Sequence, residues 1–97
     1  STNSTGEKIY QTEPTLTDTD IPNGSMWIVR NFTTSTGTVK IQGGTGSTIR
    51  HYNGSGTILD TSGSTDPFFL ARGGVATIVK VADSEYEMWG IGITGGA

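Results

Sequence analysis

Residues 73–81 read GGVATIVKV, a run of β-branched residues that follows two glycines. Branched side chains favour extended backbone, and the run lacks the caps and the apolar spacing of an amphipathic helix. Comparable runs of four to nine residues recur from Ile21 onward, separated by clusters of Gly, Ser, Thr and Asn. Short strands alternating with such turn residues are typical of small β-sandwiches and barrels.

The same pattern, applied to the whole chain, predicts strands near residues 25–32, 38–42, 47–52, 57–60, 67–71, 75–81 and 86–94. Gly73-Gly74 is interpreted as a turn, and residues 43–46 as a hairpin turn. A phosphate-binding loop at residues 43–46 is disfavoured, because no Lys follows in register and no helix pattern opens there. We therefore expect an all-β fold with essentially no helix, as a small antiparallel sandwich or jelly-roll-like barrel.

The 97 residues fit one domain, but their composition changes along the chain. Residues 1–20 are mostly small, polar or acidic, and only residues 7–11 within them resemble a strand. This segment is predicted to be a polar N-terminal arm or linker. Residues 21–97 are predicted to form a single β domain.

The predicted core is thin. Gly, Ser and Thr fill 41 of the 97 positions, and apolar residues make up 32% of the chain. A small domain with so little apolar surface usually depends on disulfides, a metal or other subunits. There is no cysteine, and His51 is the only histidine, so disulfides and thiolate or His-rich metal sites are excluded. Self-association is the remaining route to stability.

Charge and hydropathy limit the classes of partner that we expect for this chain. The net charge is −3 and the basic residues are scattered singly, so no basic patch suits a phosphate backbone and no nucleic acid is expected. No apolar run approaches the roughly 20 residues that span a bilayer, so we expect no membrane insertion. Neither end resembles a signal peptide.

No catalytic constellation is present. There is no thiol, no nucleophile elbow and no zinc-binding His pair, and His51 has no acidic partner at a motif spacing. The pairs Asp18/Asp20 and Glu85/Glu87 could each contribute to a calcium site, but solvated surface is the favoured interpretation. We predict a protein that is not an enzyme and has no cofactor and no metal.

The candidate ligand-binding residues are Arg50, His51 and Tyr52, because an aromatic face and a guanidinium suit a sugar or an acidic group. An exposed strand end is the favoured alternative. Each of the four asparagines begins an Asn-x-Ser/Thr sequon. We attribute these sequons to the high Ser and Thr content and to ordinary turn chemistry rather than to glycosylation.

Alternation assigns the faces of three strands. Val39 and Ile41 are predicted to be buried and their neighbours wet. Trp27 and Ile28 point to opposite faces, so both should be buried, one in the core and one at a subunit or sheet contact. In the closing strand the predicted core face holds Trp89, Ile91 and Ile93.

Two glycines on the other face of the closing strand, Gly90 and Gly92, are predicted to lie against another backbone, since a face without Cβ atoms permits close approach. A glycine-tolerant edge strand is the alternative.

A family resemblance rests on four segments in order. They are residues 21–31 (IPNG leading into WIVRN), 37–41 (GTVKI), 73–81 (GGVATIVKV) and 86–90 (YEMWG). From Leu16 to the C-terminus, this order resembles the small β modules of bacteriophage tail fibres and other virion appendages. The resemblance covers roughly three quarters of the chain and brings no shared catalytic residues with it.

The resemblance implies a homotrimeric structural or attachment module on the virion surface, such as a fibre tip, tail-needle knob, head fibre or decoration protein. The implied partners are other virion proteins and a polysaccharide or protein receptor on the host surface. A free-standing carbohydrate-binding or adhesin β-sandwich is the alternative, and an aromatic platform on an exposed sheet face would favour it.

Overall fold

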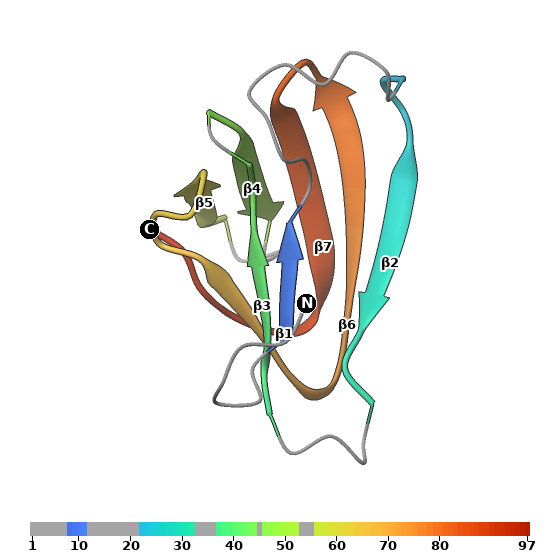
Figure 1. Cartoon of the computed structure of the whole chain (residues 1–97), viewed down its shortest axis with the longest axis vertical. Helices are drawn as coiled ribbons and strands as arrows, with labels where there is room; N and C mark the ends of the chain where they lie inside the picture. Colours follow the sequence, from blue (N-terminus) through green and yellow to red (C-terminus); the bar gives the residue numbers. More distant parts are fainter. Residues whose placement is uncertain (1–7, 12–21, 33–36, 45, 53–55) are drawn as a thin grey trace.

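The computed structural model describes residues 8–11, 22–32, 37–44, 46–52 and 56–97, and within these ranges the chain is all-β with no helix (Figure 1). Each strand overlaps a predicted one, although the predictions for residues 67–71 and 75–81 fall in a single long strand. The strands are β1 (Lys8–Gln11), β2 (Met26–Arg30), β3 (Val39–Gln42), β4 (Thr48–Tyr52), β5 (Ile58–Ser62), β6 (Phe68–Ala82) and β7 (Glu85–Gly95).

These strands form one mixed sheet that does not close. Its path is β1-β3-β6-β7-β4-β5, and β2 pairs with β6 off this path. The predicted antiparallel arrangement is wrong at two places, because β1 pairs parallel with β3 and β4 pairs parallel with β7. The predicted jelly-roll-like barrel is also wrong, because the sheet does not close, and the alternative of a sandwich stays a prediction. Turn residues indicate hairpins between consecutive strands, such as β6 with β7, whereas no local signal marks a pairing between distant strands.

Two predicted turns have other roles. Residues 43–46 connect β3 to β4, which are not neighbours in the sheet, so a hairpin there is wrong. Gly73-Gly74 lies inside β6, where the register against β7 shifts between Leu70 and Val75. Gly73 has a φ of 83°, which a residue with a side chain rarely adopts. The glycine pair therefore makes a bulge, and the chain continues as one strand.

The bulge divides β6 into two halves with different neighbours. The first half pairs with β3 at residues 68–70, and the second half pairs with β2 at residues 75–79 (Figure 1). Asn31 holds the bulge, because its backbone N–H donates to Gly74 O at 3.1 Å and its carbonyl accepts from Gly73 N at 2.7 Å.

The two halves share one core. Phe68 and Leu70 come from one half of the β6–β7 hairpin and Ile78, Tyr86 and Met88 from the other, and all five belong to a single hydrophobic cluster. Ile93 packs against this cluster. The ring of His51 on β4 also meets Phe68 edge-on, with centroids 5.7 Å apart, although β4 and the first half of β6 are not paired. The sheet therefore curves over its inner face.

The last residue of the sequence, Ala97, bonds to strand β5. Asp60 of β5 and Ala97 exchange two backbone hydrogen bonds, of 2.7 and 2.9 Å, which place the chain end beside β5 (Figure 1). The predicted alternation in β3 is confirmed, since Val39 and Ile41 are buried and Lys40 and Gln42 are not. Of the predicted N-terminal arm, only β1 lies among the described residues.

The face assignment of the closing strand is wrong. Tyr86 and Met88 point into the core, so Trp89 and Ile91 lie on the opposite, outer face, where 42% and 77% of their surfaces are exposed. Ile93 does pack against the core. Gly92, with a φ of 80°, interrupts the alternation between Ile91 and Ile93. A strand whose parity changes at a positive-φ glycine cannot be assigned to one face by counting in twos.

The approach that makes Gly90 and Gly92 necessary comes from β6 of the same chain. A Cβ on Gly90 would collide with the carbonyl oxygen of Val75 and lie 2.9 Å from Ala76 Cα. A Cβ on Gly92 would lie 3.2 Å from Gly74 Cα, within the bulge. Gly90 and Gly92 of β7 therefore lie where the backbone of β6 comes too close for a side chain.

Candidate functional site

The outer face of the sheet carries most of the exposed large apolar side chains. Register places Ile28 of β2 beside Thr77 of β6, and Thr77 beside Trp89 of β7. The row continues across β4 and β5, where Tyr52 stacks on Trp89 and pairs with Ile58. With neighbouring strands about 4.8 Å apart, this row spans roughly 19 Å of sheet.

One part of the outer face, over β2, β6 and β7, is rich in apolar side chains, although Arg30 and Thr77 lie among them. Met26 and Ile28 project from β2 with 61% and 65% of their surfaces exposed, and Ile91 projects from β7. Val75 and Val79 lie between these strands on β6, in register with Ile91 and Met26. We call Met26, Ile28, Val75, Val79 and Ile91 the apolar half. Single exposed apolar residues are common, but a contiguous group on neighbouring strands marks an interaction surface.

Beside the apolar half lies an aromatic pair, Tyr52 and Trp89. Their ring centroids are 5.7 Å apart and their planes differ by 16°. This is an offset-stacked arrangement, in which neither ring covers the whole face of the other. β4 and β7 supply one ring each, and their parallel pairing brings the rings together.

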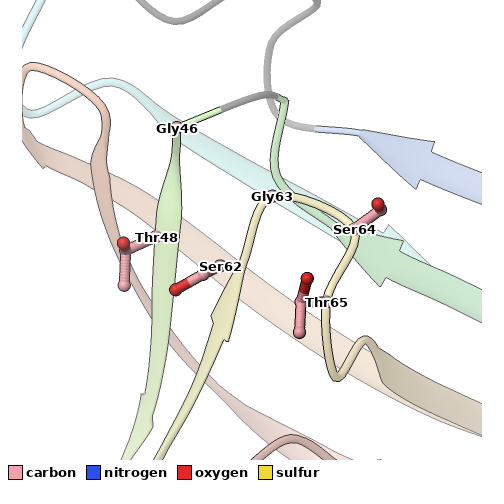
Figure 2. A pocket seen from close by; sticks show the side chains of 6 residues that line it. All are labelled: Gly46, Thr48, Ser62, Gly63, Ser64 and Thr65. Atoms are coloured by element: carbon pink, nitrogen blue, oxygen red, sulfur yellow. The ribbon is translucent and has the colours of Figure 1, made fainter.

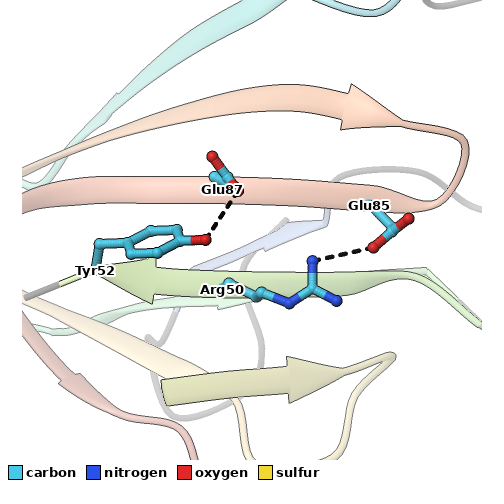
Figure 3. A network of polar contacts seen from close by, with 4 residues as sticks. All are labelled: Arg50, Tyr52, Glu85 and Glu87. Atoms are coloured by element: carbon cyan, nitrogen blue, oxygen red, sulfur yellow. Dashed lines mark hydrogen bonds and ion pairs between the residues drawn. The ribbon is translucent and has the colours of Figure 1, made fainter. Parts of the chain in front are cut away.

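A polar network borders the aromatic pair on the same two strands (Figure 3). The Tyr52 hydroxyl donates to Glu87 Oε2 at 2.9 Å, and Arg50 donates to Glu85 Oε1 at 3.0 Å. The hydrogen bond to Glu87 raises the pKa of Tyr52, and the bond to Glu85 raises the pKa of Arg50. Arg50 therefore keeps its charge. We call Arg50, Glu85 and Glu87 the polar border.

The structure separates the candidate ligand residues of the sequence. Arg50 and Tyr52 lie on the outer face with the aromatic pair, whereas His51, between them in the strand, is buried against Phe68. Alternation alone requires this separation, since adjacent residues in a strand point to opposite faces. Trp27 lies on the inner side, against Tyr86, while Ile28 is exposed in the single chain. Burial of Ile28 at a subunit contact stays a prediction.

His51 makes stability depend on pH. Burial lowers the pKa of His51 below its ordinary value of 6.5, so as pH falls the unfolded chain binds the proton first. We expect neutral His51 to make its full contribution to the free energy of unfolding above about pH 6.5, and this contribution to decrease as the pH falls below that value. Chemical denaturation of the parent and of His51→Gln between pH 7.5 and 5 measures this. An equally steep decline in the variant would assign the effect to other groups.

The acidic pairs do not form a metal centre in the described part of the chain. No group of three or more His, Cys, Asp or Glu side chains there is arranged to hold a metal ion. Glu85 and Glu87 instead bond Arg50 and Tyr52. Asp18 and Asp20 lie outside the described residues. Likewise, no helix in the described ranges is long and apolar enough to cross a membrane.

A depression of about 430 Å³ lies at the ends of β4 and β5 (Figure 2). Its walls are small and uncharged, formed by Gly46, Thr48, Ser62, Gly63, Ser64 and Thr65. Thr48 and Ser62 face each other in register across the two strands. With hydroxyls but no charge and no aromatic ring, this depression offers a ligand little beyond hydrogen bonds.

The sequon at Asn31 has a structural role. Its side-chain Nδ2 donates to Gly37 O and to Leu70 O, each at 3.0 Å, and the residue is buried. A glycan on this nitrogen is incompatible with the folded chain. Asn23 sits in an exposed turn, and Asn3 and Asn53 lie outside the described residues.

Sequence reasoning missed Trp89 as a surface residue and Glu85 and Glu87 as its neighbours. The alternation in Glu85-Tyr86-Glu87-Met88 was the available signal, because charged residues at odd positions place the odd face in water. In comparisons with known proteins, no family model, no curated protein and no solved structure matches this chain.

Proposed function

We propose that this chain is a non-enzymatic structural and attachment module of a bacteriophage virion, of the fibre, knob or decoration type, located on the particle surface. The observation that carries the proposal is the apolar half, which exposes Met26, Ile28 and Ile91 together. A contiguous apolar face serves association, and the order of sequence segments supports a virion appendage. Other virion proteins and a host-surface receptor are its proposed partners.

The apolar half is proposed to join copies of the chain into a homotrimer. The inner cluster is small, and oligomerisation would bury a second apolar surface at the same site. A sheet from another copy, packed about 10 Å away, would cover the outer face and form a two-layer sandwich between copies. Ile28 and Met26 would then lie at a contact between copies.

Native mass spectrometry and sedimentation of the purified chain test this assembly directly. We expect a trimer, with an unfolding midpoint that rises with protein concentration. A monomer whose midpoint does not change with concentration would exclude the trimer.

Ile28→Lys should weaken self-association at least tenfold, because a charge would replace an apolar side chain at the contact. Ser64→Lys, which adds the same charge at an exposed turn, is the matched control and should assemble like the parent. Equal dissociation of both variants, measured by sedimentation, would show that the apolar half is not the contact.

A free-standing carbohydrate-binding or adhesin domain is the second candidate. The observation that favours it is the offset-stacked pair Tyr52 and Trp89 on an exposed sheet face. The two candidates differ in assembly, since a free-standing module functions as a monomer. The measurements above therefore distinguish them.

A further inference from the structure

We propose that Tyr52, Trp89 and the polar border form a binding site for an uncharged pyranose sugar, such as a neutral hexose unit of a surface polysaccharide. The inference rests on the proposed attachment function and names its ligand class. It depends on the side chains that β4 and β7 bring together on the outer face.

The aromatic pair suits one face of a sugar ring. A pyranose presents C–H groups on its faces and hydroxyls around its edge, so it packs on an aromatic plane with its hydroxyls pointing outward. The rings of Tyr52 and Trp89 are parallel within 16° and offset, and Trp89 remains 42% exposed. The exposed part of the pair is the apolar surface on which a sugar ring would pack.

The polar border lies where the hydroxyls of a bound ring would point. Glu87 precedes Trp89 by two residues in β7, and Arg50 precedes Tyr52 by two in β4, so each stands about 7 Å along the sheet on the same face. Figure 3 shows Arg50 and the two glutamates along these strands. The carboxylates accept from hydroxyls and the guanidinium donates to them, which gives charge-assisted bonds.

The charge of the border selects against acidic sugars. Glu85 and Glu87 stand against a single cation, Arg50, which also feels the charge of Asp60 from β5. A uronic or sialic acid would bring another carboxylate to a site that is already net negative. A neutral sugar avoids this repulsion.

The same charges argue against a second copy as the occupant. Contacts between subunits are depleted of charged residues at their centres, because burying them requires desolvation. The side chains of Arg50 and Glu85 are 35% and 44% exposed, so they retain water in the single chain. The apolar half meets this border where Val79 pairs with Glu87, but its own members carry no charge, so it suits self-association better.

The test is an NMR titration of the full chain with cellohexaose, maltohexaose, N-acetylchitohexaose and, as the acidic probe, trigalacturonic acid. The two tryptophans supply an internal control, because Trp89 lies on the outer face and Trp27 packs against Tyr86 on the inner side. We expect at least one neutral probe to shift the indole N–H signal of Trp89 and leave that of Trp27 in place. Trigalacturonic acid should bind at least tenfold more weakly.

Trp89→Ala should reduce the affinity for that neutral probe at least tenfold, and Glu87→Gln should reduce it severalfold. Thr94→Ala, an exposed change elsewhere on β7, is the matched control and should bind within twofold of the parent. Circular dichroism of each variant separates lost binding from lost folding, and Glu87→Gln tests the site if Trp89→Ala does not fold.

Three outcomes would overturn the proposal. They are no shift of Trp89 with any neutral probe at millimolar concentration, tighter binding of the acidic probe, and burial of Trp89 between copies in the assembled protein. Native mass spectrometry is independent of these results. A trimer that binds no sugar removes the sugar site and leaves the structural role, whereas a monomer that binds one removes the trimer.

Discussion

Replacing Gly90 with valine is expected to destabilise the fold by about 3 kcal/mol, at the upper end of typical overpacking costs. A Cβ at this position would collide with the carbonyl oxygen of Val75 and lie 2.9 Å from Ala76 Cα and from Ile93 Cδ1. Two of these neighbours are backbone atoms of the paired strand β6, which cannot move without breaking the ladder. The preference of valine for strands offsets only a small part of this cost.

Thermal and chemical denaturation measure the effect of Gly90→Val. For a domain of this length, a loss of about 3 kcal/mol corresponds to a fall in Tm of roughly 10–20 °C. Thr94→Val, on an exposed position of β7, is the control and should stay within about 0.5 kcal/mol of the parent. If Gly90→Val were as stable as this control, the close approach of β6 and β7 would be wrong.

Asn31→Ala is expected to cost about 2–3 kcal/mol. The change removes two hydrogen bonds from Nδ2, to Gly37 O and Leu70 O, and leaves the buried Leu70 carbonyl without that donor. The Asn31 backbone also bonds Gly73 and Gly74, so its side chain and backbone together connect β2 to the bulge. Weakening this connection is expected to destabilise both halves of β6.

Asn31→Asp is a more stringent test, because it keeps the shape of the side chain and replaces the Nδ2 donor with a carboxylate oxygen. An ionised carboxylate facing two carbonyl oxygens is repelled, so this variant should be less stable than Asn31→Ala near pH 7. Asn23→Ala, in an exposed turn, is the matched control and should change little. Denaturation curves in which both Asn31 variants match the parent would mean that the amide does not hold the bulge.

The candidate site was only partly predictable. Residue type alone points to Tyr52 and Arg50, and strict alternation along the strand excludes His51 from the same cluster. Counting in twos places Trp89 on the wrong face, because it joins Trp89, Ile91 and Ile93 into one stripe across Gly92. The φ of 80° at Gly92 changes the parity there, and nothing local distinguishes this glycine from Gly90, whose φ is not positive.

The sequence by itself determined that the chain is all-β and where its strands fall, because branched residues and turn residues act within a few positions of one another. It also determined that the chain has no disulfide, because it contains no cysteine. Only the tertiary structure decided that β4 runs parallel to β7, that Gly73-Gly74 is a bulge and that Trp89 faces outward. These features depend on contacts between residues far apart in the chain, such as Asn31 with Gly74 and Tyr52 with Trp89. Distant contacts of this kind form only when the whole sheet is assembled.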